Sequence, residues 1–260
     1  MLLLLNNKQG GDAITRESSL SAVIDNVELD LAANITASWD GSSQTVTSLA
    51  NNDWWRGTSG SVEAVDPTLD GTAGTAGASL LFAGGDQMRQ KAVSTFGNSL
   101  HKTSQDWTFI CTFVPQKSDG GVDLLMGTRY AVGEFGLTIG YDNNGGSPRI
   151  YVLYQDNTGA TFDTFTLVSA FGDPIALGIA SNASTGALTI FENDETPQTG
   201  SAARKGADDA TNKLGVGSAA FTIDVNTKIK TLAFTSDLID ETEWDGTVLP
   251  QLNLRDGVTY

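Results

Sequence analysis

Three carboxylates close together in the sequence are candidates for acid–base chemistry. Glu192, Asp194 and Glu195 follow the apolar run LTIF directly. A pair of carboxylates on one face can cleave a glycosidic bond, one acting as acid and the other as nucleophile. Strand alternation puts Glu192 and Asp194 on one face but Glu195 on the other, and Thr196-Pro197 then ends the strand. The spacing therefore favours a polar turn over a catalytic site.

The aromatic doublet Trp54-Trp55 could stack on sugar rings, because aromatic faces pack against pyranoses. Neighbouring residues of a strand face opposite ways, so at most one of the two indoles is displayed and the other belongs to the core. Tyr130, Tyr151 and Tyr154 leave the same two alternatives open. Packing in the core or between subunits is the expected role of these side chains, and glycan contact by Trp54 or Trp55 is the alternative.

The chain has one histidine and one cysteine, which excludes several kinds of site. A zinc centre built from Cys and His needs more ligands, and a Ser-His-Asp or Cys-His site would have to use His101. No local carboxylate or nucleophile stands beside His101, so we expect a surface or capping histidine. Cys111 alternates with Phe109 and Phe113, which predicts a buried thiol of little reactivity.

Acidic loops raise the question of a bound calcium ion. The candidates are Asp119, Asp123, Asp142 and the pair Asp208-Asp209. None has the spacing of an EF-hand loop, so solvated turn acids are expected and a calcium ion is the alternative. We predict no other cofactor, since no glycine-rich loop carries the Lys and Ser/Thr of a phosphate-binding loop. The acids Glu241, Glu243 and Asp245 fall in or next to the helix expected around residues 236–244, where their spacing scatters them around the axis and leaves them solvated.

Composition narrows the function classes. The 260 residues include 15 basic and 31 acidic side chains, a formal charge of −16. Such a chain repels nucleic acids and anionic membranes. Hydrophobic residues make up 40%, enough for a packed core. No stretch approaches the roughly 18 apolar residues of a transmembrane helix, so no membrane insertion is expected.

The elements that would hold these residues are strands. Apolar residues alternate with polar ones in several segments between residues 107 and 235, and the turns at 142–148 and 184–186 predict two β-hairpins. Residues 40–79 are mostly small and polar and predict a long excursion with short strands. A single short helix is expected around residues 236–244. The pattern is that of an all-β, two-sheet antiparallel sandwich.

The N-terminus carries the run Leu2, Leu3, Leu4 and Leu5. Four exposed leucines would aggregate, so they are expected to be buried, either as an arm docked on a neighbouring chain or as an edge strand of the chain's own sheet. We therefore divide the chain into an N-terminal arm and link (1–24) and a sandwich domain (25–260).

The order of several weak motifs resembles a known family. ASLLFAGGDQM looks like the strand opening many laminin-G-like domains, WTFICTFVPQKSDGGVDLLMG like their second signature, and KLGVG followed by IKTLAFTSDLIDETEW like their closing strand and short helix. The resemblance covers about residues 25–260 and implies the concanavalin A-like jelly roll. An acidic chain of this type with a leucine-rich start looks most like virion proteins of tailed bacteriophages.

The resemblance implies a non-enzymatic virion structural protein, assembled in the host cytoplasm. It would serve as capsid decoration, fibre or tail appendage, and would dock on other virion proteins and on copies of itself through Leu2–Leu5 and its sheet edges. The alternative is a carbohydrate-binding module for host adsorption, with a glycan hydrolase of the same fold as the third hypothesis.

Overall fold

The computed structural model describes residues 15, 18–35, 37–50, 53–116, 121–142, 147–206, 208–218 and 226–260. Leu2–Leu5, Asp119 and most of the predicted arm lie outside these residues. Within the described part of the chain, no helix is both long and apolar enough to cross a membrane.

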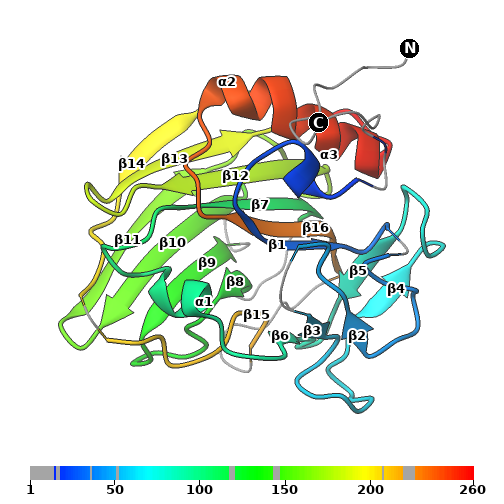
Figure 1. Cartoon of the computed structure of the whole chain (residues 1–260), viewed down its shortest axis with the longest axis horizontal. Coiled ribbons are helices and arrows are strands. Elements are labelled where there is room, and N and C mark those ends of the chain that lie inside the picture. The colour runs from blue at the N-terminus through cyan, green and yellow to red at the C-terminus, as the bar shows by residue number, and fades with distance from the viewer. Residues whose placement is uncertain are drawn as a thin grey trace.

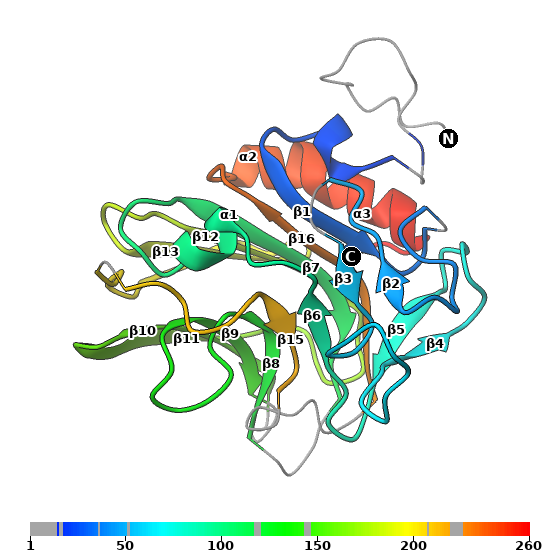
Figure 2. The ribbon, with the colours of Figure 1, turned by 60° about the horizontal axis from the view of Figure 1, so that its bottom comes forward.

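Two antiparallel eight-stranded sheets pack face to face (Figures 1 and 2). In the first, sheet A, the strands follow the order β14-β13-β12-β7-β16-β5-β4, and β1 also pairs with β16. The first half of β16 pairs with β5 and the second half with β1. The strands of sheet A are β1 (Val27–Ala32), β4 (Thr68–Asp70), β5 (Ser79–Phe82), β7 (Trp107–Val114), β12 (Ile175–Ser181), β13 (Ala187–Glu192), β14 (Gln198–Ser201) and β16 (Thr227–Thr235).

Sheet B has the order β11-β10-β9-β8-β15-β6-β3-β2. Its longest strands form the antiparallel run β8 to β11, and its other half consists of short strands from the excursion predicted at 40–79 and from later loops. The strands of sheet B are β2 (Thr45–Val46), β3 (Trp54–Trp55), β6 (Met88–Gln90), β8 (Val122–Gly127), β9 (Gly136–Asp142), β10 (Arg149–Asp156), β11 (Gly159–Thr166) and β15 (Gly215–Val216).

The core between the sheets follows the period-two pattern of the sequence. Alternate residues of β7 point into it, from Trp107 to Phe113, and they meet Leu137, Ile139 and Tyr141 of β9. The two predicted hairpins are confirmed, because β9 pairs with β10 and β12 with β13. Phe135 has the same period-two spacing as Leu137, Ile139 and Tyr141 but does not join the core, because it precedes β9 and is half-buried.

Helices cover the other face of sheet A (Figure 2). A continuous helical segment consists of α2 (Glu241–Glu243), a π-helical turn η2 (Trp244–Val248) and α3 (Leu249–Asp256), and a 3-10 turn η1 (Leu20–Ala22) lies beside it. Trp244 stacks on Phe191 of β13 with 5.3 Å between ring centroids. Because both its faces are covered, β7 is buried almost throughout.

The sequence prediction of a single helix ending near residue 244 is wrong in two respects. The helical segment begins after Asp240, whose side chain accepts a hydrogen bond from the Glu243 amide, and continues to Asp256. Burial of its apolar side on sheet A outweighs the local cost of Gly246 and Pro250. A further helix, α1 (Thr95–Ser99), was not expected, because five residues are too few to show a helical period.

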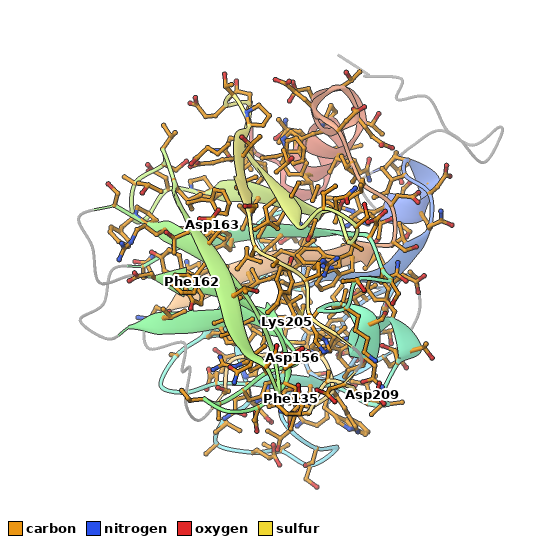
Figure 3. The ribbon with its side chains drawn as sticks, turned by 90° about the vertical axis from the view of Figure 1, so that its left-hand side faces the viewer. Phe135, Asp156, Phe162, Asp163, Lys205 and Asp209 are labelled. Carbon is orange, nitrogen blue, oxygen red and sulfur yellow. The ribbon has the colours of Figure 1, made fainter. Side chains whose placement is uncertain are left out.

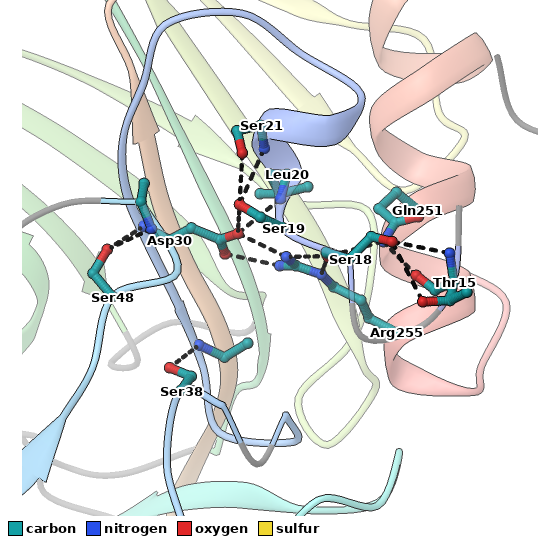
Figure 4. Close-up of polar contacts among 12 residues, drawn as sticks. Thr15, Ser18, Ser19, Leu20, Ser21, Asp30, Ser38, Ser48, Gln251 and Arg255 are labelled. Atoms are coloured by element: carbon teal, nitrogen blue, oxygen red, sulfur yellow. Dashed lines mark hydrogen bonds and ion pairs between the residues drawn. The ribbon is translucent and has the colours of Figure 1, made fainter. Parts of the chain in front are cut away.

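A buried ion pair fixes this helical layer (Figure 4). The Arg255 guanidinium of α3 donates to both carboxylate oxygens of Asp30 in β1, at 2.8 and 2.7 Å, and neither side chain is exposed. Asp30 also accepts from the Leu20 amide at 2.8 Å, and Arg255 donates to the Ser18 carbonyl. One charge pair thus joins α3, β1 and η1.

Candidate functional site

The carboxylates predicted from residues 192–195 are not assembled for catalysis. Glu192 is the last residue of β13, is only 3% exposed, and accepts hydrogen bonds from the backbone amides of Val168 and Ser169 at 2.7 Å each. Its carboxylate therefore anchors the segment after β11. Asp194 and Glu195 lie exposed in the turn that follows.

The two tryptophans face opposite ways, as strand alternation requires. Trp54 is completely buried in the core, so it has no surface to offer a glycan. Trp55 is half-buried, with the Lys91 ammonium 4.3 Å from its ring centroid. Of this doublet only Trp55 has an accessible ring, and its glycan contact stays a prediction.

His101 is buried, so the expected surface position is wrong. Its Nε2 lies 3.0 Å from the Asp208 carbonyl oxygen, and no described residue is within hydrogen-bond reach of Nδ1. Burial is the main cause that lowers the pKa of the imidazole, and the cations of Lys102 and Arg204 lower it further. The hydrogen bond to the Asp208 carbonyl and the charge of Asp156 raise this pKa, but by less than burial lowers it. Local sequence did not signal this, because the covering segment comes from a distant part of the chain.

Cys111 lies in the core as predicted, and burial raises the pKa of its thiol well above the usual value. The acids considered for calcium have other neighbours. Asp142 pairs with Arg149, and Asp209 pairs with Lys102 at 2.7 Å. Asp123 is buried in β8 instead of lying in a solvated turn. No three His, Cys, Asp or Glu side chains gather at a metal-binding distance within the described ranges.

A surface hollow of about 550 Å³, the rim pocket, lies where β6, α1, the β8–β9 loop and the segment after β14 meet. Apart from β6 and α1, these segments are far apart in the sequence, so no sequence motif could indicate the pocket. Its wall includes Arg89, Gln90, Asn98, Tyr130, Asp209, Asn212 and Lys213.

One wall of the rim pocket is a guanidinium stacked on a phenol ring. The Arg89 guanidinium carbon lies 4.1 Å from the Tyr130 ring centroid. Backbone carbonyls of Met88 and Val216 hold Arg89 in place, and the Tyr130 hydroxyl donates to the Lys213 carbonyl. Burial raises the pKa of Tyr130 to about 12, so the ring is a neutral phenol at physiological pH.

The rest of the wall offers hydrogen-bonding groups of both kinds. The side-chain amide of Asn212 donates to the Glu134 carboxylate at 2.8 Å, and this bond orients the Asn212 side chain. Asn98 is half-exposed and lines the hollow. Asp209 is the single carboxylate among the described lining residues, and Lys102 neutralises it. The pocket can therefore bind a polyhydroxylated ligand but brings no pair of acids to one bond.

The segment after β14 that forms this wall is anchored at several points. The Lys205 amide donates to the His101 carbonyl at 2.8 Å, and the Gly206 amide donates to Asp156 at 3.0 Å. Figure 3 shows Asp156, Lys205 and Asp209 toward the same end of the molecule. The position of the pocket wall thus depends on contacts to the buried His101 and to the end of β10.

These features define the class: the chain is a two-sheet antiparallel sandwich with a concanavalin A-like fold, a largely covered outer face on one sheet and a polar hollow at its rim. No protein-family model and no curated protein matches the sequence.

Among solved structures, the chain is similar to the botulinum neurotoxin serotype D binding domain, with a TM-score of 0.58, 13% identity, and coverage of 86% of this chain and 51% of that one. It is also similar to Trypanosoma rangeli sialidase in complex with sialic acid, with a TM-score of 0.58, 15% identity, and coverage of 92% and 35%. The chain thus spans about half of the first and about a third of the second. At such identities the likeness extends to the fold alone.

Proposed function

We propose that the protein is a non-enzymatic glycan-binding module and that the rim pocket receives the sugar. The observation that carries the proposal is the composition of this hollow. Its volume of about 550 Å³ is within the roughly 300–1,000 Å³ typical of small-molecule sites. Its wall combines the Arg89–Tyr130 stack with amide, ammonium and carboxylate groups, which suits a ring rich in hydroxyls.

Two further observations support binding without hydrolysis. Glycoside cleavage uses two carboxylates about 5–9.5 Å apart, whereas the described lining residues of the pocket include only Asp209. Glu192, the acid closest to a hydrolase pattern, is engaged by two backbone amides. One fold neighbour is a sialidase in complex with sialic acid, which supports including sialylated glycans among the probes.

The test is a glycan array of neutral and sialylated oligosaccharides, followed by calorimetric titration with the best-bound glycan. Asn98→Ala and Lys213→Ala should each weaken affinity about threefold to tenfold, the effect of losing one hydrogen bond. Lys228→Ala is the matched control and should not change affinity, because this half-exposed lysine of β16 pairs with Asp70 and does not line the pocket. Binding that is equally strong in all three variants would place the sugar elsewhere.

The virion structural role rests on the sequence resemblance and is kept as a second proposal, compatible with glycan binding. The leucine run Leu2–Leu5 is the feature that motivates it, since such a run must be buried and docking on a neighbouring chain is one of the two ways to bury it. Deleting residues 1–10 tests it: particles should lose the protein if the arm is its anchor, and normal occupancy would contradict that role.

A further inference from the structure

An aromatic pair, the exposed Phe162 and the half-buried Tyr151, lies on the outer face of sheet B. In the β10–β11 register Leu153 is opposite Phe162, and Tyr151 is opposite Thr164. Val152 and Tyr154 alternate with these residues and point into the core, so Tyr151 and Phe162 point outward. Their ring centroids are 5.1 Å apart at an interplanar angle of 33°, and Phe162 is 59% exposed. Figure 3 shows Phe162 on β11 at the side of the sandwich.

Polar groups border this aromatic pair. Arg129 extends over the neighbouring strands, where its Nε donates to the Gln155 side chain at 2.8 Å and its Nη1 to the Thr138 hydroxyl at 3.4 Å. The guanidinium is close enough to Tyr151 to interact with its phenol electrostatically. The surface is therefore two tilted rings beside a cation that is only 5% exposed and is held in place by Gln155 and Thr138.

The aromatic pair is connected to the rim pocket through the loop between β8 and β9. Arg129 of this loop borders the pair, and the next residue, Tyr130, forms a wall of the pocket. Glu134 of the same loop accepts from the Tyr130 amide at 2.7 Å and from Asn212 of the opposite wall. The β8–β9 loop, which these hydrogen bonds hold in place, thus lies between the rim pocket and the aromatic pair and contributes residues to both.

The size and chemistry of the Tyr151–Phe162 pair indicate what kind of ligand it binds. A stable protein interface buries about 800 Å² on each partner, usually around several anchors. Two adjacent rings are a much smaller apolar surface than that. The hydrogen-bonded Arg129 and Gln155 side chains give this surface a polar edge, which suits a hydroxylated ligand better than an apolar partner. A pyranose ring presents one flat apolar face to aromatic rings and hydroxyls to polar groups at their edge.

We propose that Tyr151 and Phe162 form a second sugar subsite, so that the ligand is an oligosaccharide extending from the rim pocket past Arg129 onto the outer face of sheet B. This inference rests on the proposed function and specifies its ligand class: a chain of several sugar units rather than a single terminal residue. Affinity should then increase with chain length, since each stacked unit adds contacts that a disaccharide in the pocket does not make.

The experiment uses the full chain and array-selected oligosaccharides, in length series from one to six units of cello-, malto-, chito- and sialyl-lactosamine type. For the series that binds, calorimetric titration compares the disaccharide with the hexasaccharide. Phe162→Ala should weaken hexasaccharide binding at least tenfold and leave disaccharide binding within twofold. Asn98→Ala in the pocket should weaken both. Val168→Ala, another exposed apolar side chain, at 66% exposure, is the matched control and should change neither.

The outcomes separate this inference from the proposed function. If no series binds, the glycan-binding function itself is wrong. If glycans bind and Asn98→Ala weakens them, but Phe162→Ala changes no chain length, the rim pocket stands and the second subsite is overturned. If Phe162→Ala instead converts a dimer to a monomer in sedimentation analysis, the aromatic pair is an interface between copies and the inference is also overturned. Unchanged thermal unfolding of Phe162→Ala confirms that the variant is folded.

Discussion

The outer faces of the two sheets differ in what covers them. On sheet A, helices α2 and α3 and the η1 turn bury Ile110, Phe191 and Trp244 in a second apolar cluster. On sheet B, Phe162 of β11 is 59% exposed and the neighbouring Tyr151 of β10 is half-buried. The same architecture thus covers one outer surface with helices, which stabilises the fold, and leaves aromatic side chains accessible on the other, where we propose that a ligand binds.

The arginines on the two sides show the same difference. Arg255 is unexposed, and both its charge and its donors are matched by Asp30 and the Ser18 carbonyl. Arg89 is half-exposed, is held by carbonyls, and stacks on Tyr130 at the edge of a hollow. A buried cation with a matched carboxylate maintains a fold, whereas a fixed cation at a hollow can contribute to binding.

The largest effect is expected from breaking the ion pair under the helices. Arg255→Ala leaves Asp30 as an unpaired buried charge, which should lower the free energy of unfolding by about 3–5 kcal/mol. Urea unfolding followed by circular dichroism measures this. A loss below about 1 kcal/mol would show that the pair does not hold the helical layer to sheet A.

A second test concerns the contact between Trp244 and the sheet. A Cβ added at Gly178 would come within 2.6 Å of the Trp244 ring, so glycine is what allows the indole to lie on β12. Gly178→Ala should cost about 1–3 kcal/mol by overpacking. Chemical unfolding and the intrinsic fluorescence of the variant together test this, and an unchanged transition would mean that the helix can shift without loss.

The start of the helical segment should contribute less. Asp240→Ala removes the side-chain bond to the Glu243 amide and should cost about 1 kcal/mol. Asp240→Asn is the matched control, because asparagine caps nearly as well. Thermal unfolding compares the three proteins, and equal losses in both variants would argue against capping as the cause.

The side of the rim pocket should respond to pH through His101. Because the folded-state pKa of His101 is lowered, the unfolded chain binds the proton more readily than the folded protein. The stabilisation is present above the unfolded pKa of about 6.5 and is lost as the pH falls from there towards the folded pKa. In His101→Gln, the free energy of unfolding should therefore decrease less between pH 7 and pH 5 than in the unmodified protein. The Arg255–Asp30 pair should not contribute to this difference, because arginine stays charged over this range. An unchanged slope would show that other groups cause the decrease.

The smallest effect on stability is expected on the open face. Phe162 is mostly exposed, so Phe162→Ala should change the free energy of unfolding by no more than about 0.5 kcal/mol. Differential scanning calorimetry of this variant and Val168→Ala is the measurement. A loss above 2 kcal/mol would mean that the ring is part of the fold, and the contrast between the two faces would then be wrong.

Sequence reasoning located the core but not the site. Alternation from Trp107 to Phe113 predicted the inward side of β7, because Thr108 and Thr112 interrupt the apolar residues on one face and so mark the opposite face as the more apolar. The helix after Asp240 was underestimated, because Gly246 and Pro250 are unfavourable locally and its stability comes from packing on sheet A. The rim pocket had no local signal at all. Arg89, Tyr130 and Asn212 belong to three distant segments, and only the pairing of β6 with β15 and the loops around them bring these residues together.

The pairing of β1 with β16 has a consequence for biosynthesis. Among the described residues, the strand that pairs with Val27–Ala32 is Thr227–Thr235, and the side chain that forms an ion pair with Asp30 is Arg255. During synthesis, β1 therefore cannot pair with β16 and Arg255 until residues 227–256 have left the ribosome. A product that ends before them lacks both the partner strand of β1 and the counter-charge of the buried Asp30 carboxylate. Copies that end before residue 227 should therefore be degraded or aggregate more readily than copies that include these residues.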